Sequence, residues 1–381
     1  MSIYETREGF EGIVEKFKSF LKYSALIYSE EFFQKHKKFL APIPFILEVI
    51  SILILASEVF STESQILFNF SFDILCGYLQ VAPKIFSIFV NSLEINGIFE
   101  WFHELHRERE NDLIAKEILI FKHFLMKFYL NFLSEKIHRF VALTYSYSAC
   151  AILFAIFYNQ GNLMHFKVPF VDDDNVIIHR LIGLIPFLYN IYNSILSDYT
   201  AIFIGIYFIG ALNILNMLIG KLNESSNIPS AGKVLLPNII KLHMEIISKL
   251  DVFCEVFFLT FIIQLLTSVM LILFKFYLLM QSINFLYFSV LCCIFIQFAL
   301  FCLFGQIIFN KSERIFTELY QTKWYEMEIK DQKALLLIMK LSQKTVGLKA
   351  AGMYDINFVM FFQVTKMCLS YGALLYTLLS K

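Results

Sequence analysis

Charged residues are scarce in this chain. Only 17% of its 381 residues are Asp, Glu, Lys or Arg, against about 25% in an ordinary soluble domain. Hydrophobic residues make up 58% of the chain, and the mean hydropathy is +0.64. A soluble chain of this length would need many more charged side chains to remain dispersed. The composition therefore argues against a soluble protein and predicts an all-α membrane protein whose helices are apolar on most faces.

A net charge is absent as well, because 32 basic and 32 acidic side chains cancel. Nothing in the overall balance therefore indicates a nucleic acid or polyacidic partner. The first residues lack the apolar core and small-residue cleavage site of a signal peptide, so we expect insertion through internal spans. The seven cysteines lie within apolar runs, which predicts packing rather than disulfides.

Enzymatic motifs are weak. His103 and His106 flank Glu104 at a spacing of i and i+3, whereas a helical zinc protease site needs i and i+4. The sequence holds no glycine-rich phosphate loop and no serine elbow. We therefore expect neither a cofactor nor an enzyme. A membrane enzyme that uses His103 and His106 remains the contrasting hypothesis.

Long apolar runs are plentiful. A spanning helix needs about 20 mostly apolar residues, and the chain offers seven such runs. They cover residues 39–57, 66–90, 137–158, 181–219, 252–280, 284–309 and 354–379. The fourth is long enough to project beyond the bilayer. This divides the chain into an N-terminal segment (1–38), spans one to six (39–309), a polar connection (310–353) and a seventh span (354–381).

The basic residues fix the orientation. Four segments, 1–38, 84–139, 220–251 and 310–353, hold 27 of the 32 Lys and Arg residues and lie on one side of the predicted spans. The positive-inside rule places that side in the cytosol. The N-terminus is thus predicted to be cytosolic and the C-terminus extracellular, the reverse of a G-protein-coupled receptor.

The cytosolic segments have a helical pattern. Segment 310–353 carries apolar residues at helical spacings among its charges, which predicts amphipathic helices packed as an anchor bundle below the membrane. These residues are Ile315, Leu319, Leu335, Leu336, Ile338, Met339 and Leu341. Segment 220–235 is rich in Ser, Asn, Pro and Gly and is predicted to be a flexible loop.

Ionisable residues at membrane depth face protein or water, because lipid does not solvate them. The candidates are Glu48, Asp73, Asp198, Glu255 and Lys366. For Glu48, Asp73 and Glu255, an internal hydrogen bond is at least as good an explanation as a functional role. Asp198 could pair with a group on another helix.

The seventh span carries one polar stripe. Gln363, Lys366, Ser370 and Thr377 share a helical face, and Leu374 fills the gap in it. Such a stripe has to meet protein or water. Periodicity leaves two readings open: a pore with an apolar constriction, and a polar seam buried against neighbouring helices.

Aromatic residues gather in the outer halves of spans two, three, four and six. Such a lining suits a small, mainly apolar ligand, although aromatic residues also anchor helices at the membrane interface. The predicted pocket residues are Phe68, Phe70, Tyr145, Tyr147, Phe154, Tyr189, Tyr192, Phe285, Tyr287 and Phe288.

The C-terminal third contains an ordered set of short motifs. They are Gly305-Gln306, the run Leu319 to Tyr325, the run Leu335 to Lys340, Ala351-Gly352 and Ser370-Tyr371 with Leu374-Leu375. This set resembles the signature of insect odorant receptors. The order and spacing of the motifs match over about 80 residues. The seven spans and the cytosolic N-terminus agree with the same family.

The resemblance implies a ligand-gated, non-selective cation channel of four subunits in the plasma membrane of a sensory neuron. This chain would be a tuning subunit that binds a volatile ligand and assembles with co-receptor subunits. Leu374 would form the pore constriction and Thr377 its outer mouth. Tyr320, Trp324 and Tyr325 would belong to the assembly region. A gustatory-receptor-like channel that opens without a co-receptor is the alternative.

Overall fold

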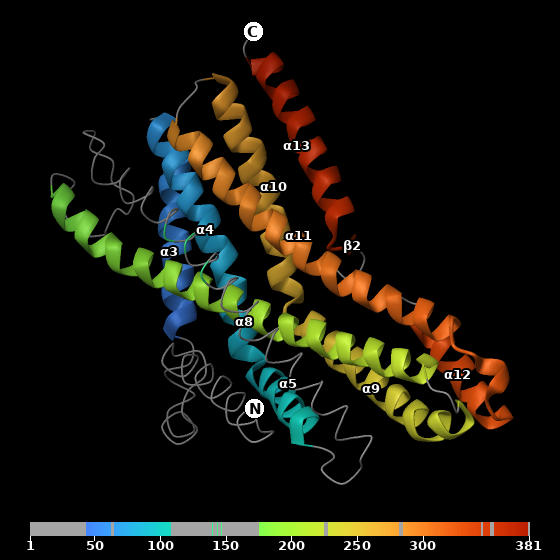
Figure 1. The fold of residues 1–381 in the computed structure, drawn as a ribbon. Helices are drawn as coiled ribbons and strands as arrows, with labels where there is room; N and C mark the ends of the chain where they lie inside the picture. The colour runs from blue at the N-terminus through green and yellow to red at the C-terminus, as the bar shows by residue number, and fades with distance from the viewer. Residues whose placement is uncertain are drawn as a thin grey trace.

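The computed structural model describes residues 43–61, 65–107, 139, 143, 146, 175–224, 228–281, 285–343, 346–350 and 354–379. The N-terminal segment 1–38, and all but three residues of the predicted third span, lie outside these. Almost every described residue is helical (Figure 1). The long helices are α3 (Ile43–Ser61), α4 (Gln65–Val90), α5 (Ser92–Arg107), α8 (Val176–Glu224), α9 (Ile228–Val256), α10 (Phe258–Gln281), α11 (Phe285–Tyr320), α12 (Ile329–Ser342) and α13 (Phe358–Leu379).

Two short elements complete the order. A single 3-10 turn, η2 (Trp324–Glu326), separates α11 from α12. Between α12 and α13, strands β1 (Lys349–Ala350) and β2 (Tyr354–Asp355) form an antiparallel pair in which Lys349 faces Asp355. This hairpin turns the chain back towards the membrane before the last helix begins.

The predicted spans agree with the described helices. Four of these helices are long and apolar enough to cross a membrane, namely α8, α10, α11 and α13, and the bent pair α4–α5 makes a fifth. The bend of 66° between α4 and α5 falls at Asn91. The prediction that the fourth span projects beyond the bilayer is confirmed, because the 49 residues of α8 reach about 73 Å at 1.5 Å per residue.

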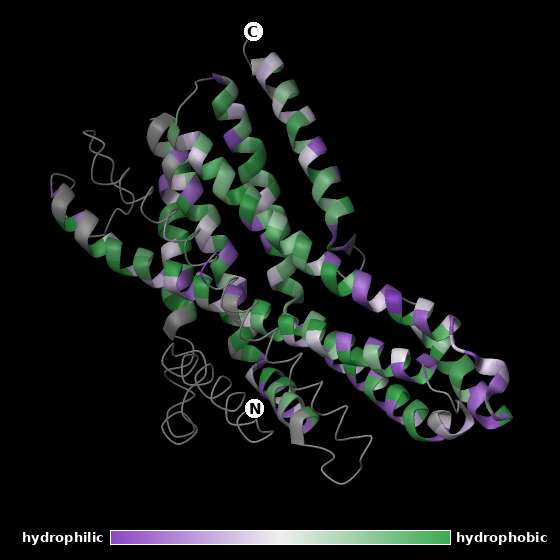
Figure 2. Cartoon of the chain, viewed as in Figure 1, coloured by the Kyte–Doolittle hydropathy of each residue, from purple (hydrophilic) through white to green (hydrophobic). Residues whose placement is uncertain are grey.

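Polar residues concentrate at one end of the molecule. Figure 2 shows that hydrophilic side chains gather over the far ends of α8, α9 and α11 and over α12, whereas α10 and the first half of α11 are mainly hydrophobic. The predicted amphipathic faces are present there: Ile315, Leu319, Leu335 and Ile338 are at most 1% exposed. These four helix segments pack together, and because we expect them below the membrane we call them the cytosolic bundle.

The predicted loop at 220–235 is wrong over most of its length. Helix α8 continues to Glu224, and α9 begins at Ile228. Pro229 lies at the start of α9, where a proline fits because its missing N–H has no partner within the helix. The proline therefore begins a helix here instead of marking a loop.

An aromatic core joins the membrane helices to the cytosolic bundle. Phe102 of α5 stacks on Tyr207 of α8 with ring centroids 3.5 Å apart, and the Tyr207 hydroxyl donates to the Phe102 carbonyl at 3.1 Å. Trp101 stacks on Phe208 and donates its Nε1–H to Glu245 of α9 at 3.2 Å. Phe253 of α9 meets Phe208 from the other side. This packing fixes α5, α8 and α9 relative to one another.

Candidate functional site

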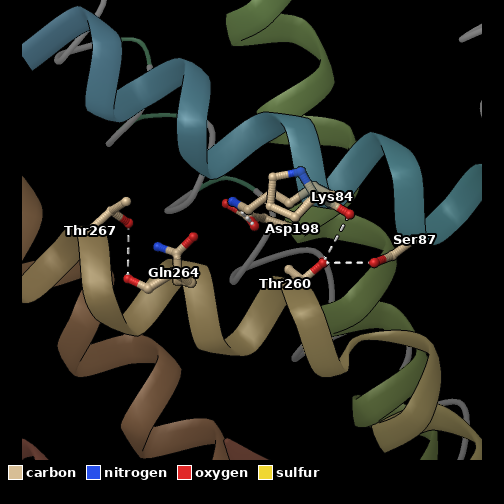
Figure 3. A network of polar contacts seen from close by, with 7 residues as sticks. Lys84, Ser87, Asp198, Thr260, Gln264 and Thr267 are labelled. Atoms are coloured by element: carbon tan, nitrogen blue, oxygen red, sulfur yellow. Dashed lines mark hydrogen bonds and ion pairs between the residues drawn. The ribbon is translucent and has the colours of Figure 1, made fainter. Parts of the chain in front are cut away.

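A buried ion pair joins α4 to α8. Lys84 Nζ lies 2.5 Å from Asp198 Oδ1, and the lysine side chain is only 1% exposed (Figure 3). The predicted pairing of Asp198 with another helix is thus confirmed. Lys84 belongs both to the predicted span 66–90 and to the connection 84–139 over which basic residues are counted, and the structure places it inside α4 in agreement with the span. A lysine this deep is stable only with an opposite charge nearby.

Hydrogen bonds extend this ion pair to α10. The Thr260 hydroxyl lies 3.3 Å from the Pro83 carbonyl and 3.2 Å from Ser87 Oγ, both on α4. About two turns further along α10, Thr267 donates to the Gln264 carbonyl of the same helix (Figure 3). Polar contacts thus join α4 to α8 through the ion pair and α4 to α10 through Thr260.

A second ion pair joins α4 to α10 nearer the start of α4. Lys275 pairs with Asp73 and is 1% exposed. Its ammonium lies 5.2 Å from the ring centroid of Tyr287 and 5.4 Å from that of Phe274, so both rings add cation–π attraction. Glu48 of α3 likewise accepts a hydrogen bond from Asn190 of α8 at 2.5 Å. Glu255, in contrast, is exposed near the end of α9.

The structure gathers part of the predicted aromatic pocket. Phe68 is half-buried, stacks on Phe72 at 6.0 Å and meets Phe274 at 6.1 Å. Tyr287 is half-buried on the other side of Lys275. These contacts place Phe68 beside Phe274 and Tyr287 beside Lys275, so both rings lie near the Asp73–Lys275 pair.

The other predicted pocket residues are not brought into that cluster. Tyr189 is half-buried on α8, while Tyr192, Phe285 and Phe288 are exposed. The remaining four lie outside the described part of the chain or have side chains outside it: Phe70, Tyr145, Tyr147 and Phe154.

Contacts with α11 fix the start of α13. Gln306 Oε1 accepts the backbone N–H of Phe358 at 3.1 Å, and Asn357 Oδ1 caps the helix by accepting that of Met360 at 2.9 Å. A Cβ at Gly305 would lie 2.0 Å from the Ile356 carbonyl oxygen. The Gly305-Gln306 pair therefore allows the chain before α13 to cross α11 closely. The sequence contains these two residues, but it does not reveal their role.

One face of α13 packs against α10 and the opposite face is exposed. Cys368 and Gly372 are buried, with the Cys368 thiol 3.9 Å from the Val269 carbonyl and the Gly372 backbone against the Phe276 ring. At 100° per residue, the predicted stripe lies on the opposite side of the helix. All five of its described members are exposed, namely Gln363, Lys366, Ser370, Leu374 and Thr377. The described residues of this chain therefore do not bury the stripe as a polar seam.

The predicted assembly residues are also exposed. Tyr320, Trp324 and Tyr325 are 68%, 53% and 65% exposed at the junction of α11 and η2. Two apolar residues of α12, Ile329 and Leu336, are similarly exposed. Together these five residues form an uncovered apolar surface at the tip of the cytosolic bundle.

The described residues hold no group of three or more His, Cys, Asp or Glu side chains placed for a metal ion. The side chains of His103 and His106 lie outside the described set. The arrangement thus offers buried polar contacts between helices and an exposed polar stripe on α13.

Comparison with known proteins gives two kinds of match. A family model described as 7tm Odorant receptor matches residues 82–369. No curated protein matches the chain significantly.

Two solved structures share the fold. The insect olfactory receptor OR5 from Machilis hrabei in complex with eugenol is similar with a TM-score of 0.76 and 16% identity, covering 98% of this chain and 99% of that one. The structure of the same receptor described without a ligand gives a TM-score of 0.77 and 15% identity, covering 97% and 98%.

Proposed function

Because this chain belongs to the 7tm odorant receptor family, we propose that it is a tuning subunit of an odorant-gated, non-selective cation channel. It binds a small, mainly apolar volatile ligand in the outer half of the membrane bundle. Binding favours the open state, and α13 moves so that the pore widens. The channel is a heterotetramer with co-receptor subunits in the plasma membrane, with the N-terminus cytosolic and the C-terminus outside.

The exposed stripe of α13 carries this proposal. Lipid offers no hydrogen bonds, so polar side chains on a membrane helix need protein or water. The stripe lies opposite the face that packs on α10 and is exposed within the described part of the chain, which favours water or another subunit as its cover. A pore at the centre of several copies provides both.

The gate in this proposal is Leu374. It is the apolar member of the stripe and is 51% exposed. A ring of such side chains narrows a pore enough to expel water and stop ions. Ser370 and Gln363 line the pathway on the cytosolic side of the ring, and Thr377 lines its outer mouth.

The ligand site in this proposal is built around Phe68 and Tyr287. Their rings lie beside α10, which also contacts α13, so a ligand there is one helix away from the gate. The similar receptor from Machilis hrabei was solved with eugenol, a small aromatic volatile. We propose that the outer aromatic residues of spans two, three, four and six recognise a ligand of comparable size by shape.

Assembly in this proposal uses the cytosolic bundle. Exposed apolar patches mark interaction surfaces, and Tyr320, Trp324 and Tyr325 form one with Ile329 and Leu336. Contact with co-receptor subunits at this tip would leave α13 free to move.

The test is substitution of Leu374 in channels co-expressed with a co-receptor. Leu374→Ala should produce current without ligand, because the smaller side chain no longer dewets the constriction. Leu369→Ala is the matched control, since Leu369 is an exposed leucine of the same helix that lies outside the stripe. Unchanged gating in Leu374→Ala, with normal surface expression, would remove Leu374 from the role. Ligand-evoked current from the chain expressed alone would favour the gustatory-receptor-like alternative.

A further inference from the structure

Helix α13 contains a single charged residue. Its sequence, FVMFFQVTKMCLSYGALLYTLL, has Lys366 and no Asp, Glu or Arg. Lys366 is exposed, and it makes no ion pair with any described residue. Its charge is therefore uncompensated within the described part of the chain.

The other two lysines of the membrane bundle behave differently. Lys84 and Lys275 are each 1% exposed and each pairs with an aspartate on a neighbouring helix. An ammonium at membrane depth needs such a partner or water. Lys366 is exposed and has no carboxylate partner among the described residues, which favours contact with water.

Its position on the helix fixes where that water lies. Lys366 is one turn from Gln363 and Ser370 on the stripe. It is eight residues before Leu374, which corresponds to about 12 Å along the helix axis. It lies a similar distance from the start of α13 at Phe358. The charge is thus on the cytosolic side of the proposed gate and well inside the helix.

We propose that Lys366 lines the inner half of the conduction pathway and lowers the permeability of cations, of divalent cations most. The proposal rests on the proposed function of α13 as the pore helix. A unit charge about 6 Å from the ion path, in surroundings as polar as water, reduces sodium entry about threefold and calcium entry about tenfold. Each copy of this chain in a channel therefore shifts selectivity away from calcium.

The experiment compares reversal potentials in sodium and calcium solutions. Lys366→Gln, Lys366→Glu and the charge-conserving control Lys366→Arg are expressed with a co-receptor on the Leu374→Ala background, which supplies current without ligand. Per copy in the channel, the calcium-to-sodium permeability ratio should rise about threefold in Lys366→Gln and about tenfold in Lys366→Glu. It should stay unchanged in Lys366→Arg, and the differences should grow at low ionic strength.

The outcomes separate the two proposals. Equal permeability ratios in all four channels would overturn the role of Lys366 while leaving the gate intact, and would mean that its ammonium reaches the lipid headgroups instead of the pore. An absence of current from Leu374→Ala, with normal surface expression, would overturn the pore proposal and this one with it.

Discussion

Helices α4 and α13 both carry polar side chains within their membrane-spanning stretches. Those of α4 pair with neighbouring helices, whereas those of α13 are exposed. On α4, Asp73 and Lys84 are paired with Lys275 and Asp198 of neighbouring helices. On α13, Lys366 and Ser370 are exposed and lie on the face opposite the one that packs on α10. The difference indicates that the polar groups of α4 hold one subunit together, whereas those of α13 act outside it. Substitutions on α4 should therefore change stability, and those on the α13 stripe should change current.

The largest expected effect comes from breaking the Lys84–Asp198 pair. Lys84→Met removes the charge that faces the half-buried Asp198, which costs up to about 3–5 kcal/mol of stability. The double variant Lys84→Met with Asp198→Leu should recover most of that loss, because neither charge is then buried alone. Thermal unfolding of the purified protein in detergent measures both.

The control for that experiment is the exposed pair of Lys233 and Glu328. These side chains lie 2.5 Å apart in the cytosolic bundle and are 57% and 53% exposed. The carboxylate raises the pKa of Lys233 through a hydrogen bond, but water screens the pair. Lys233→Met should leave the unfolding temperature almost unchanged. A loss equal to that of Lys84→Met would contradict the distinction between buried and exposed pairs.

A smaller effect is expected at the contact between α13 and α10. A Cβ at Gly372 would lie 2.4 Å from the Phe276 ring, so Gly372→Ala forces the two helices apart. Overpacking of this kind costs about 1–3 kcal/mol. Because α13 is the pore helix in the proposed function and this contact positions it, we also expect an altered open probability, measured in single-channel recordings.

Gly77→Ala on α4 is the matched control for Gly372→Ala. A Cβ there would meet nothing within 4 Å, so Gly77→Ala should leave gating and stability unchanged or slightly improve stability. Adding Phe276→Leu to Gly372→Ala should restore gating. Failure of that second substitution to do so would show that the close approach does not set the position of α13.

The smallest effects compare two hydroxyl groups. Thr260 of α10 bonds to α4, so Thr260→Val should cost about 1 kcal/mol. Ser370 is exposed on the stripe, so Ser370→Ala should cost less than about 0.5 kcal/mol. In current recordings the order reverses, and Ser370→Ala should change conductance more than Thr260→Val does. If Thr260→Val had the larger effect on both stability and conductance, the proposed difference between the two hydroxyl groups would be wrong.

The sequence predicts the membrane helices well because apolar length is a local property. Residues 66–90 are predicted as a span and 65–90 form α4. The amphipathic residues Ile315 and Leu335 are buried as their spacing indicates. The stripe on α13 is likewise visible from periodicity alone.

Pairing between helices could not be predicted, because it depends on tertiary packing. The sequence places Lys84 both in the predicted span 66–90 and in the connection 84–139, and only the structure shows that Asp198 lies beside it within the bundle. The exposure of the stripe on α13 also depends on tertiary packing, since its periodicity was equally compatible with a seam buried against neighbouring helices. The composition of segment 220–235 wrongly predicted a loop. The cause is local, because Pro229 lies in the first turn of α9, where a proline is compatible with a helix.

The central claim is that the stripe of α13 faces the ion pathway, and a charged thiol reagent applied to open channels tests it most directly. Ser370→Cys and Leu369→Cys both place a thiol at an exposed position, about 100° apart around the helix. The account predicts that the reagent rapidly reduces current through Ser370→Cys channels and leaves Leu369→Cys channels unaffected. Equal block at both positions, or no block at Ser370→Cys, would contradict it.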